Sequence, residues 1–315
     1  MTLCDDDDAR YPPNLARYRL SDGTNEWTVG GARGTCELVD LDGTRYAEGH
    51  SLFFGQHNLE YFGEDEYMMF DNNFNVSTTD EFVGGAPSRL LIVNVDEARE
   101  TATLEWELVL DDHTCIYGDN DRLPTGNLLG SSWPRVIDAS ADFQYDARIF
   151  EVKRDTKQVA FEAFVVGQRC TEPAHGSDGC VRTYKGGYPN GWSMYSVERF
   201  YEAPLVYALD CVRRGGATLL NVTTHDSFKM SSISPGSYKV FRHGENGAEG
   251  DAPLAQGDFT FAPHWRPTTL TIDLSHAFGD DDDDDGDGDD ARDDGMVAIT
   301  NKWGDQTRKH FSCRS

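Results

Sequence analysis

Hydrophobic residues lie in short runs separated by turn-forming residues, and few windows show the three-and-four spacing of an amphipathic helix. The chain carries 31 glycines and 12 prolines, which interrupt these runs throughout. Such runs are typical of β-strands, and we expect strands at 36–41, 67–70, 89–95, 103–110, 127–131, 148–152, 158–166 and 192–201. The pattern therefore predicts an antiparallel all-β protein.

The pattern changes after Arg214-Gly215-Gly216, where long polar turns separate the strands. Residues 270–274 and 296–301 alternate between apolar and polar side chains, which predicts two half-buried strands of one hairpin, joined by an aspartate-rich loop at 280–294. We therefore expect three parts: an acidic N-terminal segment at 1–24, a first β domain at 25–210 and a second β domain at 211–315.

The first β domain contains an internal repeat. The strands that begin at Arg89 and Thr103 recur as strands that begin at Arg148 and Val159, and residues 118–129 align with residues 57–68 at an offset of 61. Residues 36–40 form a third, partial copy. Four strands in a unit of about 50–60 residues are typical of a propeller blade. Coincidental similarity between ordinary hairpins is the alternative.

The ordered motifs of this domain resemble the arylsulfotransferase-type β-propellers. The resemblance covers roughly residues 25–210 and rests on Gln56-His57-Asn58, Phe70-Asp71-Asn72, Ser88-Arg89 through Asp96, Leu104–Glu107, Gly118–Pro124 and, as the terminal blade, Gly191–Tyr201. Residues 259–304 look like the β-sandwich that follows the propeller in eukaryotic relatives. The predicted fold is thus a partial β-propeller of about three four-stranded blades, followed by a β-sandwich.

The resemblance implies a chemistry: transfer of a sulfuryl group from a phenolic sulfate ester to a phenol, without a nucleotide sulfate donor. In the bacterial enzymes a channel histidine becomes transiently sulfated, which is nucleophilic catalysis through a covalent intermediate. Only His57 falls on the matching position here, so we take it as the candidate nucleophile. The equivalent position of the next repeat is Gly118.

Arg199 and Tyr195 are the candidate groups for stabilising the anionic sulfuryl group. Each also has a structural alternative, an Arg–Glu pair and a packed strand tyrosine. Arg89 and Arg148 recur at one blade position and are expected to pair within the repeat. Whether the chain is an enzyme stays open at this stage, because a catalytically silent extracellular binding module has the same fold.

Acidic residues number 55 and basic residues 28, which gives a formal net charge of −27 at pH 7. Because nucleic acids and anionic membranes bind basic patches, the balance argues against both as partners. No run approaches the roughly 20 apolar residues of a membrane helix. The aspartates of 280–294 lack the glutamate that an EF-hand needs, since Arg292 stands in its place. We therefore expect no metal and no cofactor.

Seven cysteines include no CxxC pair, so a zinc finger is not supported. Cys170 and Cys180 bracket a polar loop, and we expect them to form a small disulfide hairpin; two unpaired thiols are the alternative. Asn75 and Asn221 begin acceptor triplets for N-glycosylation. These features favour a secreted, extracellular glycoprotein.

The expected blade number raises a question of closure. The propellers of the family close with six blades, and about three would leave bare strand edges that invite aggregation. We therefore expect the sequence to be the C-terminal part of a longer protein whose missing part includes a secretion signal. A complete short chain that closes its edges in an oligomer is the alternative.

Overall fold

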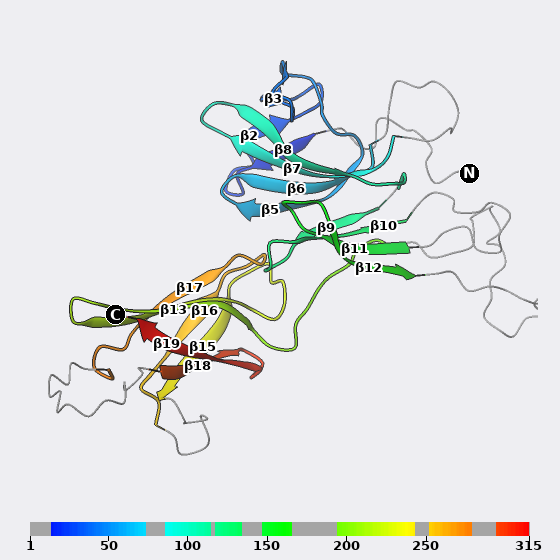
Figure 1. The fold of residues 1–315 in the computed structure, drawn as a ribbon. Coiled ribbons are helices and arrows are strands. Elements are labelled where there is room, and N and C mark those ends of the chain that lie inside the picture. Colours follow the sequence, from blue (N-terminus) through cyan, green and yellow to red (C-terminus); the bar gives the residue numbers. More distant parts are fainter. Residues whose placement is uncertain are drawn as a thin grey trace, which may run out of the picture. The chain divides into compact units, whose positions relative to one another are not determined.

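The computed structural model describes residues 14–73, 86–114, 117–133, 147–165, 194–242, 252–278 and 294–314. All regular elements in these ranges are β-strands, labelled β1 to β19 in Figure 1. The prediction of an all-β protein is therefore confirmed, while the number of blades stays a prediction. Within the described ranges, no helix has the length and apolar character needed to cross a membrane. The chain divides into two compact units, Met1–Glu198 and Arg199–Ser315.

The first unit contains a two-stranded sheet and a six-stranded sheet. Their strands are β1 (Leu15–Tyr18), β2 (Asn25–Val29), β3 (Glu37–Val39), β4 (Arg45–Tyr46), β5 (Gln56–Gly63), β6 (Glu66–Asp71), β7 (Arg89–Asp96) and β8 (Thr101–Val109). Strands β5 to β8 pair with their sequence neighbours in an antiparallel meander. The six-stranded order is β4-β3-β8-β7-β6-β5, so β5 lies at one edge.

A second four-stranded meander follows in the same unit. It consists of β9 (Asp119–Arg122), β10 (Leu128–Ser132), β11 (Ala147–Val152) and β12 (Val159–Val165). The two meanders coincide with the two repeats found in the sequence. The third, partial copy behaves differently, because β3 pairs in parallel with β8 and extends the outer edge of the first meander. The backbone N–H of Glu37 donates to Glu100, which anchors β3 at that edge.

Strands β6 and β7 are buried on both faces, because the first meander lies between two other layers. On one face, Met69 packs in a cluster with Trp27 of β2. On the other face, Phe70 packs in a cluster with Phe150 of β11. Each of these side chains is less than a tenth exposed, so replacing one of them by alanine would cost about 2–5 kcal/mol.

The two recurring arginines pair within their own meanders, as expected. Arg89 forms a fork on Asp71 of the neighbouring strand, with its Nε 3.0 Å and its Nη2 2.5 Å from Oδ2. Arg148 donates from Nε to Glu162 of β12 at 2.6 Å. Both side chains are largely buried, which suits a role in holding adjacent strands together.

The second unit is a single seven-stranded sheet that folds over on itself. Its strands are β13 (Leu205–Arg214), β14 (Ala217–His225), β15 (Ser234–Arg242), β16 (Ala255–Phe261), β17 (Thr268–Asp273), β18 (Asp294–Asn301) and β19 (Gln306–Arg314). The order is β16-β15-β18-β19-β13-β14-β17, and β19 pairs antiparallel with β18 and in parallel with β13. Val222 and Ile272 from one end of this order share a core with Val240 and Val297 from the other. The unit is therefore a nearly closed, sandwich-like sheet.

Two details of the second unit differ from the sequence-based expectation. Strands β17 and β18 do not form a hairpin, since β17 pairs with β14 while β18 pairs with β15 and β19. The two strands therefore belong to opposite halves of the strand order, although they follow one another in the sequence. Strand β18 is also buried on both faces rather than half-buried. Both differences depend on pairing between distant strands, which local alternation does not report.

The division between the units falls between Glu198 and Arg199, earlier in the chain than residue 211. The Arg214-Gly215-Gly216 segment, which the sequence analysis placed near the domain boundary, is the turn of the β13–β14 hairpin. Gly215 and Gly216 have φ values of +60° and +80°, as a tight two-residue hairpin turn requires. The expected strand at 192–201 is absent from its described part, residues 194–201.

Candidate functional site

His57 lies on β5, the edge strand of the first meander, which contacts β9 of the second meander (Figure 1). The side chain is half-buried. Its Nδ1 atom lies 3.0 Å from the carbonyl oxygen of Gly55 and 2.5 Å from Oδ1 of Asn72. The imidazole is therefore held through Nδ1 by the residues on either side of the β5–β6 hairpin.

Asn72 is completely buried just after β6. Its Nδ2 atom donates to the carbonyl oxygen of Thr114 at 2.5 Å and to that of Tyr117 at 2.9 Å. The amide thus joins the histidine of β5 to the segment that precedes β9.

The preceding residue, Asp71, anchors this corner. It accepts hydrogen bonds from the backbone N–H groups of Phe54 at 2.8 Å and Asn73 at 3.0 Å, in addition to the fork from Arg89. Burial raises the pKa of Asp71, while the Arg89 guanidinium and the two backbone donors oppose the rise. The Asp71-Asn72 pair therefore has two separate functions: Asp71 fixes the backbone and Asn72 contacts His57.

Asp119 connects the two meanders to the segment at the end of the first unit. Its carboxylate accepts from the Asn58 side chain, from Ser196 Oγ at 2.8 Å and from the Val197 backbone N–H at 2.6 Å. Asn58 also donates to the carbonyl oxygen of Asn120 at 2.9 Å. Asp119 is only 2% exposed, so its charge is engaged by internal donors.

Tyr195 lies in the same region as His57. Its ring contacts the Tyr117 ring edge-on at a centroid distance of 5.0 Å, and the Tyr117 carbonyl is the one that accepts from Asn72. Tyr195 is 68% exposed, so it is not the packed strand tyrosine of the structural alternative. Arg199 is the first residue of the second unit, whereas His57 and Tyr195 belong to the first unit.

Gly118, the position equivalent to His57 in the second repeat, cannot carry a side chain. A Cβ atom there would lie 2.4 Å from Cδ1 and Cε1 of the Phe70 ring, and its φ is +107°. The close packing of Phe70 between the two meanders therefore explains why the repeat has glycine here. The structure thus offers one histidine, not two, at this pair of positions.

The other predicted site residues are less informative. Asn221 lies in β14, where its Oδ1 accepts from Thr271 at 2.8 Å. Asn75, Cys170 and Cys180 lie outside the described residues, so their glycosylation and disulfide bond stay predictions. Within the described ranges, no three His, Cys, Asp or Glu side chains are grouped to hold a metal ion.

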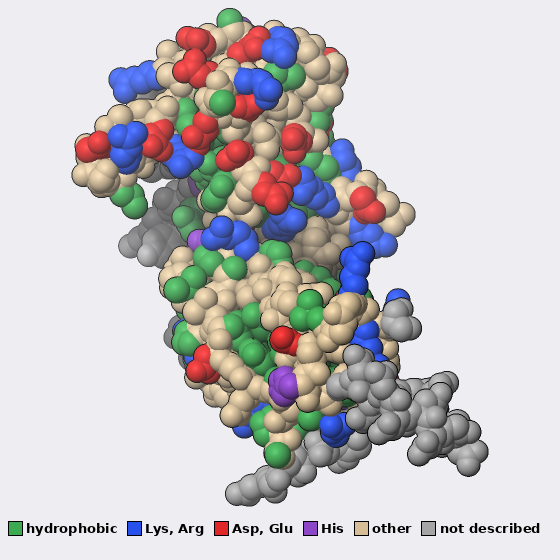
Figure 2. Space-filling model, turned by 90° about the vertical axis from the view of Figure 1, so that its left-hand side faces the viewer, with side chains coloured by type: hydrophobic (Ala, Val, Ile, Leu, Met, Phe, Trp, Pro, Cys, Tyr) green, Lys and Arg blue, Asp and Glu red, His purple; other side chains and the backbone are tan. Residues whose placement is uncertain are grey.

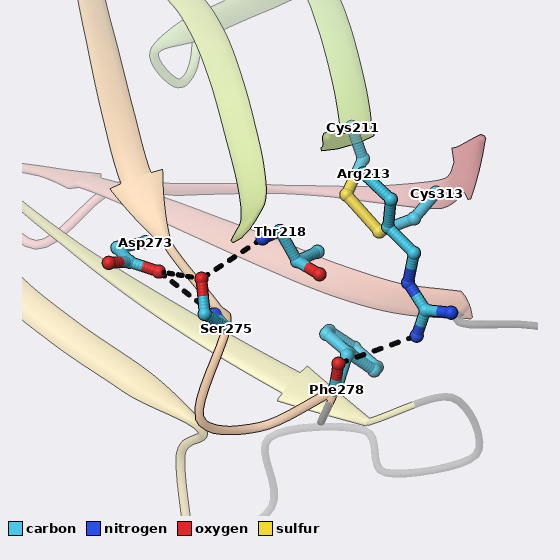
Figure 3. The surroundings of a disulfide bond; sticks show 7 residues. All are labelled: Cys211, Arg213, Thr218, Asp273, Ser275, Phe278 and Cys313. Atoms are coloured by element: carbon cyan, nitrogen blue, oxygen red, sulfur yellow. Dashed lines mark hydrogen bonds between the residues drawn. A yellow bond between two sulfur atoms is a disulfide. The ribbon is translucent and has the colours of Figure 1, made fainter. Parts of the chain in front are cut away.

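A disulfide that the sequence analysis did not predict joins Cys211 of β13 to Cys313 of β19 (Figure 3). The two cysteines are register partners on adjacent parallel strands, with Cα atoms 4.4 Å apart. They are 102 positions apart in sequence, so no local spacing indicates the pair. The nearby Arg213 donates to the carbonyl oxygen of Phe278 at 3.4 Å. The only sequence signal was the number of cysteines.

Charged side chains of both signs are interspersed on the face of the molecule drawn in Figure 2. Many of the described arginines pair with carboxylates: Arg154 with Glu66 at 2.5 Å and Arg19 with Glu26 at 3.2 Å are examples. In pairs of this kind a carboxylate neutralises the charge of the arginine, as expected for a chain whose excess of acidic residues gives a formal net charge of −27.

Together, the two stacked meanders and the histidine on an edge strand define an all-β protein of the propeller type with a polar site at its strand edges. Residues 18–173 match the family model of the arylsulfotransferases (ASST), so the chain contains a domain of this family. No curated protein matches the sequence. Among solved structures, a β-glucosidase from Listeria innocua in complex with glucose is similar at 13% identity and a TM-score of 0.22. That match covers 42% of this chain and 19% of the glucosidase, and it bears on neither fold nor function.

Proposed function

We propose that this protein transfers a sulfuryl group from a phenolic sulfate ester to a phenol, with His57 as the nucleophile. The arylsulfotransferase domain at 18–173 supports an activity of this general kind. The observation that carries the finer proposal is the position of His57: it lies within that domain, on an edge strand, with its ring held at Nδ1. An imidazole anchored through one nitrogen can attack with the other.

Tyr195 is the residue of the first unit that we propose to act together with His57. Tyr195, which packs on Tyr117, would contact the aryl ring or donate a hydrogen bond to the sulfuryl oxygens. Arg199, in the second unit, stays a sequence-based candidate for countering the negative charge of the transferring group. No metal or cofactor is part of the proposed reaction.

We further propose that the protein works in an oxidising, extracellular compartment. The Cys211–Cys313 disulfide supports this, because such bonds persist mainly in secreted proteins. The acceptor triplets at Asn75 and Asn221 are consistent with passage through the secretory pathway.

The test uses the purified protein with a nitrophenyl sulfate as donor and a phenol as acceptor. We expect release of nitrophenol, a sulfated acceptor and, when the acceptor is omitted, a sulfuryl mass on the peptide that contains His57. His57→Ala should abolish all three. The matched control is His50→Ala, because His50 is an exposed histidine of the same unit that packs on Tyr46.

Two results would overturn the proposal. Turnover that persists in His57→Ala would exclude His57 as the nucleophile. The absence of both turnover and adduct in the unmodified protein would favour the catalytically silent binding module.

A further inference from the structure

Asn72 contacts His57 in a way that determines which atom of the ring can react. The two partners of its Nδ2 atom, the carbonyl oxygens of Thr114 and Tyr117, can only accept hydrogen bonds. The amide nitrogen must therefore face them. This fixes the orientation of the side chain and directs Oδ1 toward Nδ1 of His57.

The second neighbour of Nδ1 leads to the same conclusion. The carbonyl oxygen of Gly55, 3.0 Å away, is also an acceptor without a proton. Nδ1 must therefore carry a hydrogen, since otherwise its lone pair would face the lone pairs of two oxygens. A neutral imidazole has one N–H, so the lone pair of His57 is on Nε2.

We infer that Asn72 is a positioning residue for His57: it keeps the ring in the Nδ1–H form, so that Nε2 is the nucleophilic atom. This inference rests on the proposed function for its catalytic consequence, but the tautomer itself does not. Because the Asn72 side chain is buried and held at both ends, it also limits rotation of the ring. A residue that acts in this way affects the rate of the chemical step more than the binding of substrate.

Transfer proceeds in two steps. The Nε2 lone pair attacks sulfur, an S–N bond forms, and the ester S–O bond breaks with its electron pair leaving on the phenolate oxygen. The sulfated ring is then cationic, and its Nδ1–H still donates to Asn72. In the second step the acceptor oxygen attacks sulfur, the S–N electron pair returns to Nε2, and the phenol proton passes to solvent.

An amide suits this cycle better than a carboxylate. The neutral Asn72 Oδ1 accepts the Nδ1–H hydrogen bond without adding negative charge beside the ring. A carboxylate at this position would favour the imidazolium form of the ring through its negative charge. The protonated ring has no Nε2 lone pair with which to attack sulfur.

The direct test is the ¹⁵N spectrum of the unmodified, ¹⁵N-labelled protein above the pKa of its histidines. Long-range proton–nitrogen correlations distinguish Nδ1–H from Nε2–H in each ring. We expect His57 in the Nδ1–H form. An Nε2–H form in the unmodified protein would overturn the inference without any variant having to fold.

Two variants test how Asn72 contributes to the tautomer of His57 and to the rate. In Asn72→Ala we expect His57 to populate the Nε2–H form and kcat to fall about 10–100-fold with little change in KM. In Asn72→Asp we expect the Nδ1–H form to persist and the acidic limb of the rate profile to move to higher pH. The matched control is Asn73→Gly, since Asn73 donates to Pro87 and has a φ of +57° that glycine tolerates.

His113 serves as the internal reference, because its Nδ1 lies 2.9 Å from the carbonyl oxygen of Ala86, which is also an acceptor without a proton. An unchanged His57 tautomer in Asn72→Ala would show that the Gly55 carbonyl alone determines the tautomer, and would overturn the role of Asn72. Turnover that persists in His57→Ala would instead overturn the proposed function and leave the tautomer result standing.

Discussion

Asn58 and Asp119 occupy the same position in two successive repeats, and they are hydrogen bonded to each other. The pair links β5 to β9 at the strand edges, next to His57. Asp119 also accepts from Ser196 and Val197, so one buried carboxylate holds three parts of the first unit together.

Loss of Asp119 should release the segment that contains Val197. In Asp119→Ala the donors of Asn58, Ser196 and Val197 lose their acceptor, which costs about 1–3 kcal/mol for each one that stays buried and unpaired. Hydrogen exchange of the Val197 amide should become at least about tenfold faster. The amide of Met69, in the core of β6, should keep its protection unless the whole unit unfolds.

The control for this substitution is Asp155→Asn, since Asp155 is exposed and only caps its own turn through the Thr156 N–H. That variant should leave exchange at Val197 unchanged. Unchanged exchange in Asp119→Ala would show that other contacts hold the segment.

A side chain at Gly118 should destabilise the first unit through overlap with Phe70. Gly118→Ala places a Cβ atom on a residue with a positive φ and forces the Phe70 ring to move. We expect the free energy of unfolding to fall by about 2–3 kcal/mol and the Tm to fall by about 5–10 °C. The control is Gly126→Ala in the same meander. Gly126 has a φ of +83° but open space around its Cα, so this variant measures the backbone cost alone. Equal losses in the two variants would contradict the role of Phe70.

Removal of the Cys211–Cys313 disulfide should destabilise the second unit. The bond closes a loop of 102 positions, and chain entropy predicts a contribution of about 4–5 kcal/mol for a loop of this length. We expect Cys211→Ala/Cys313→Ala to lower the Tm of one calorimetric transition. A dithiol should have the same effect on the unmodified protein and none on the double variant. A dithiol that shifts the double variant equally would show that another bond is responsible.

Replacement of Asp112 should stabilise the protein at neutral pH. Burial raises the pKa of Asp112, and its Oδ1 atom has no hydrogen-bond partner. Because the folded protein binds this proton more tightly than the unfolded chain, the cost of ionisation is present above the raised pKa. It fades as the pH falls below the unfolded value of about 3.9.

We therefore expect Asp112→Asn to raise the Tm by about 1–3 °C at pH 7 and to have no effect near pH 3. Denaturation at a series of pH values provides the measurement. Asp42→Asn is the contrasting control, because the Thr44 backbone N–H lowers the pKa of Asp42 and the substitution removes a favourable charge. A gain in Asp112→Asn that does not depend on pH would exclude ionisation as its cause.

The sequence allowed the local elements of the fold to be predicted. Strands β7, β8, β10 and β11 lie within a few residues of their expected positions, since β-branched runs and turn residues report extended backbone directly. The repeat located both meanders. The parallel addition of β3 and the separation of β17 from β18 could not be predicted, because pairing between distant strands depends on tertiary packing.

The candidate site was predicted only in part. His57 was identified from the family motif, but its contact with Asn72 requires the β5–β6 hairpin to bring the two residues together. The contact between the Tyr195 and Tyr117 rings likewise depends on the course of the chain after residue 193. The Cys211–Cys313 bond connects strands that meet only when the second unit folds. The spacing of the cysteines in the sequence therefore does not predict this bond.

The packing of Phe70 against Gly118 also constrains the order in which substitutions at residues 70 and 118 could be accepted. A histidine introduced at residue 118 by copying the first repeat would meet the Phe70 ring, and would be lost unless position 70 had already become smaller. A smaller residue at 70 leaves a cavity in the shared core, so that first substitution is unfavourable as well. Each of the two routes passes through a less stable intermediate, and the difference between the two repeats is thereby preserved.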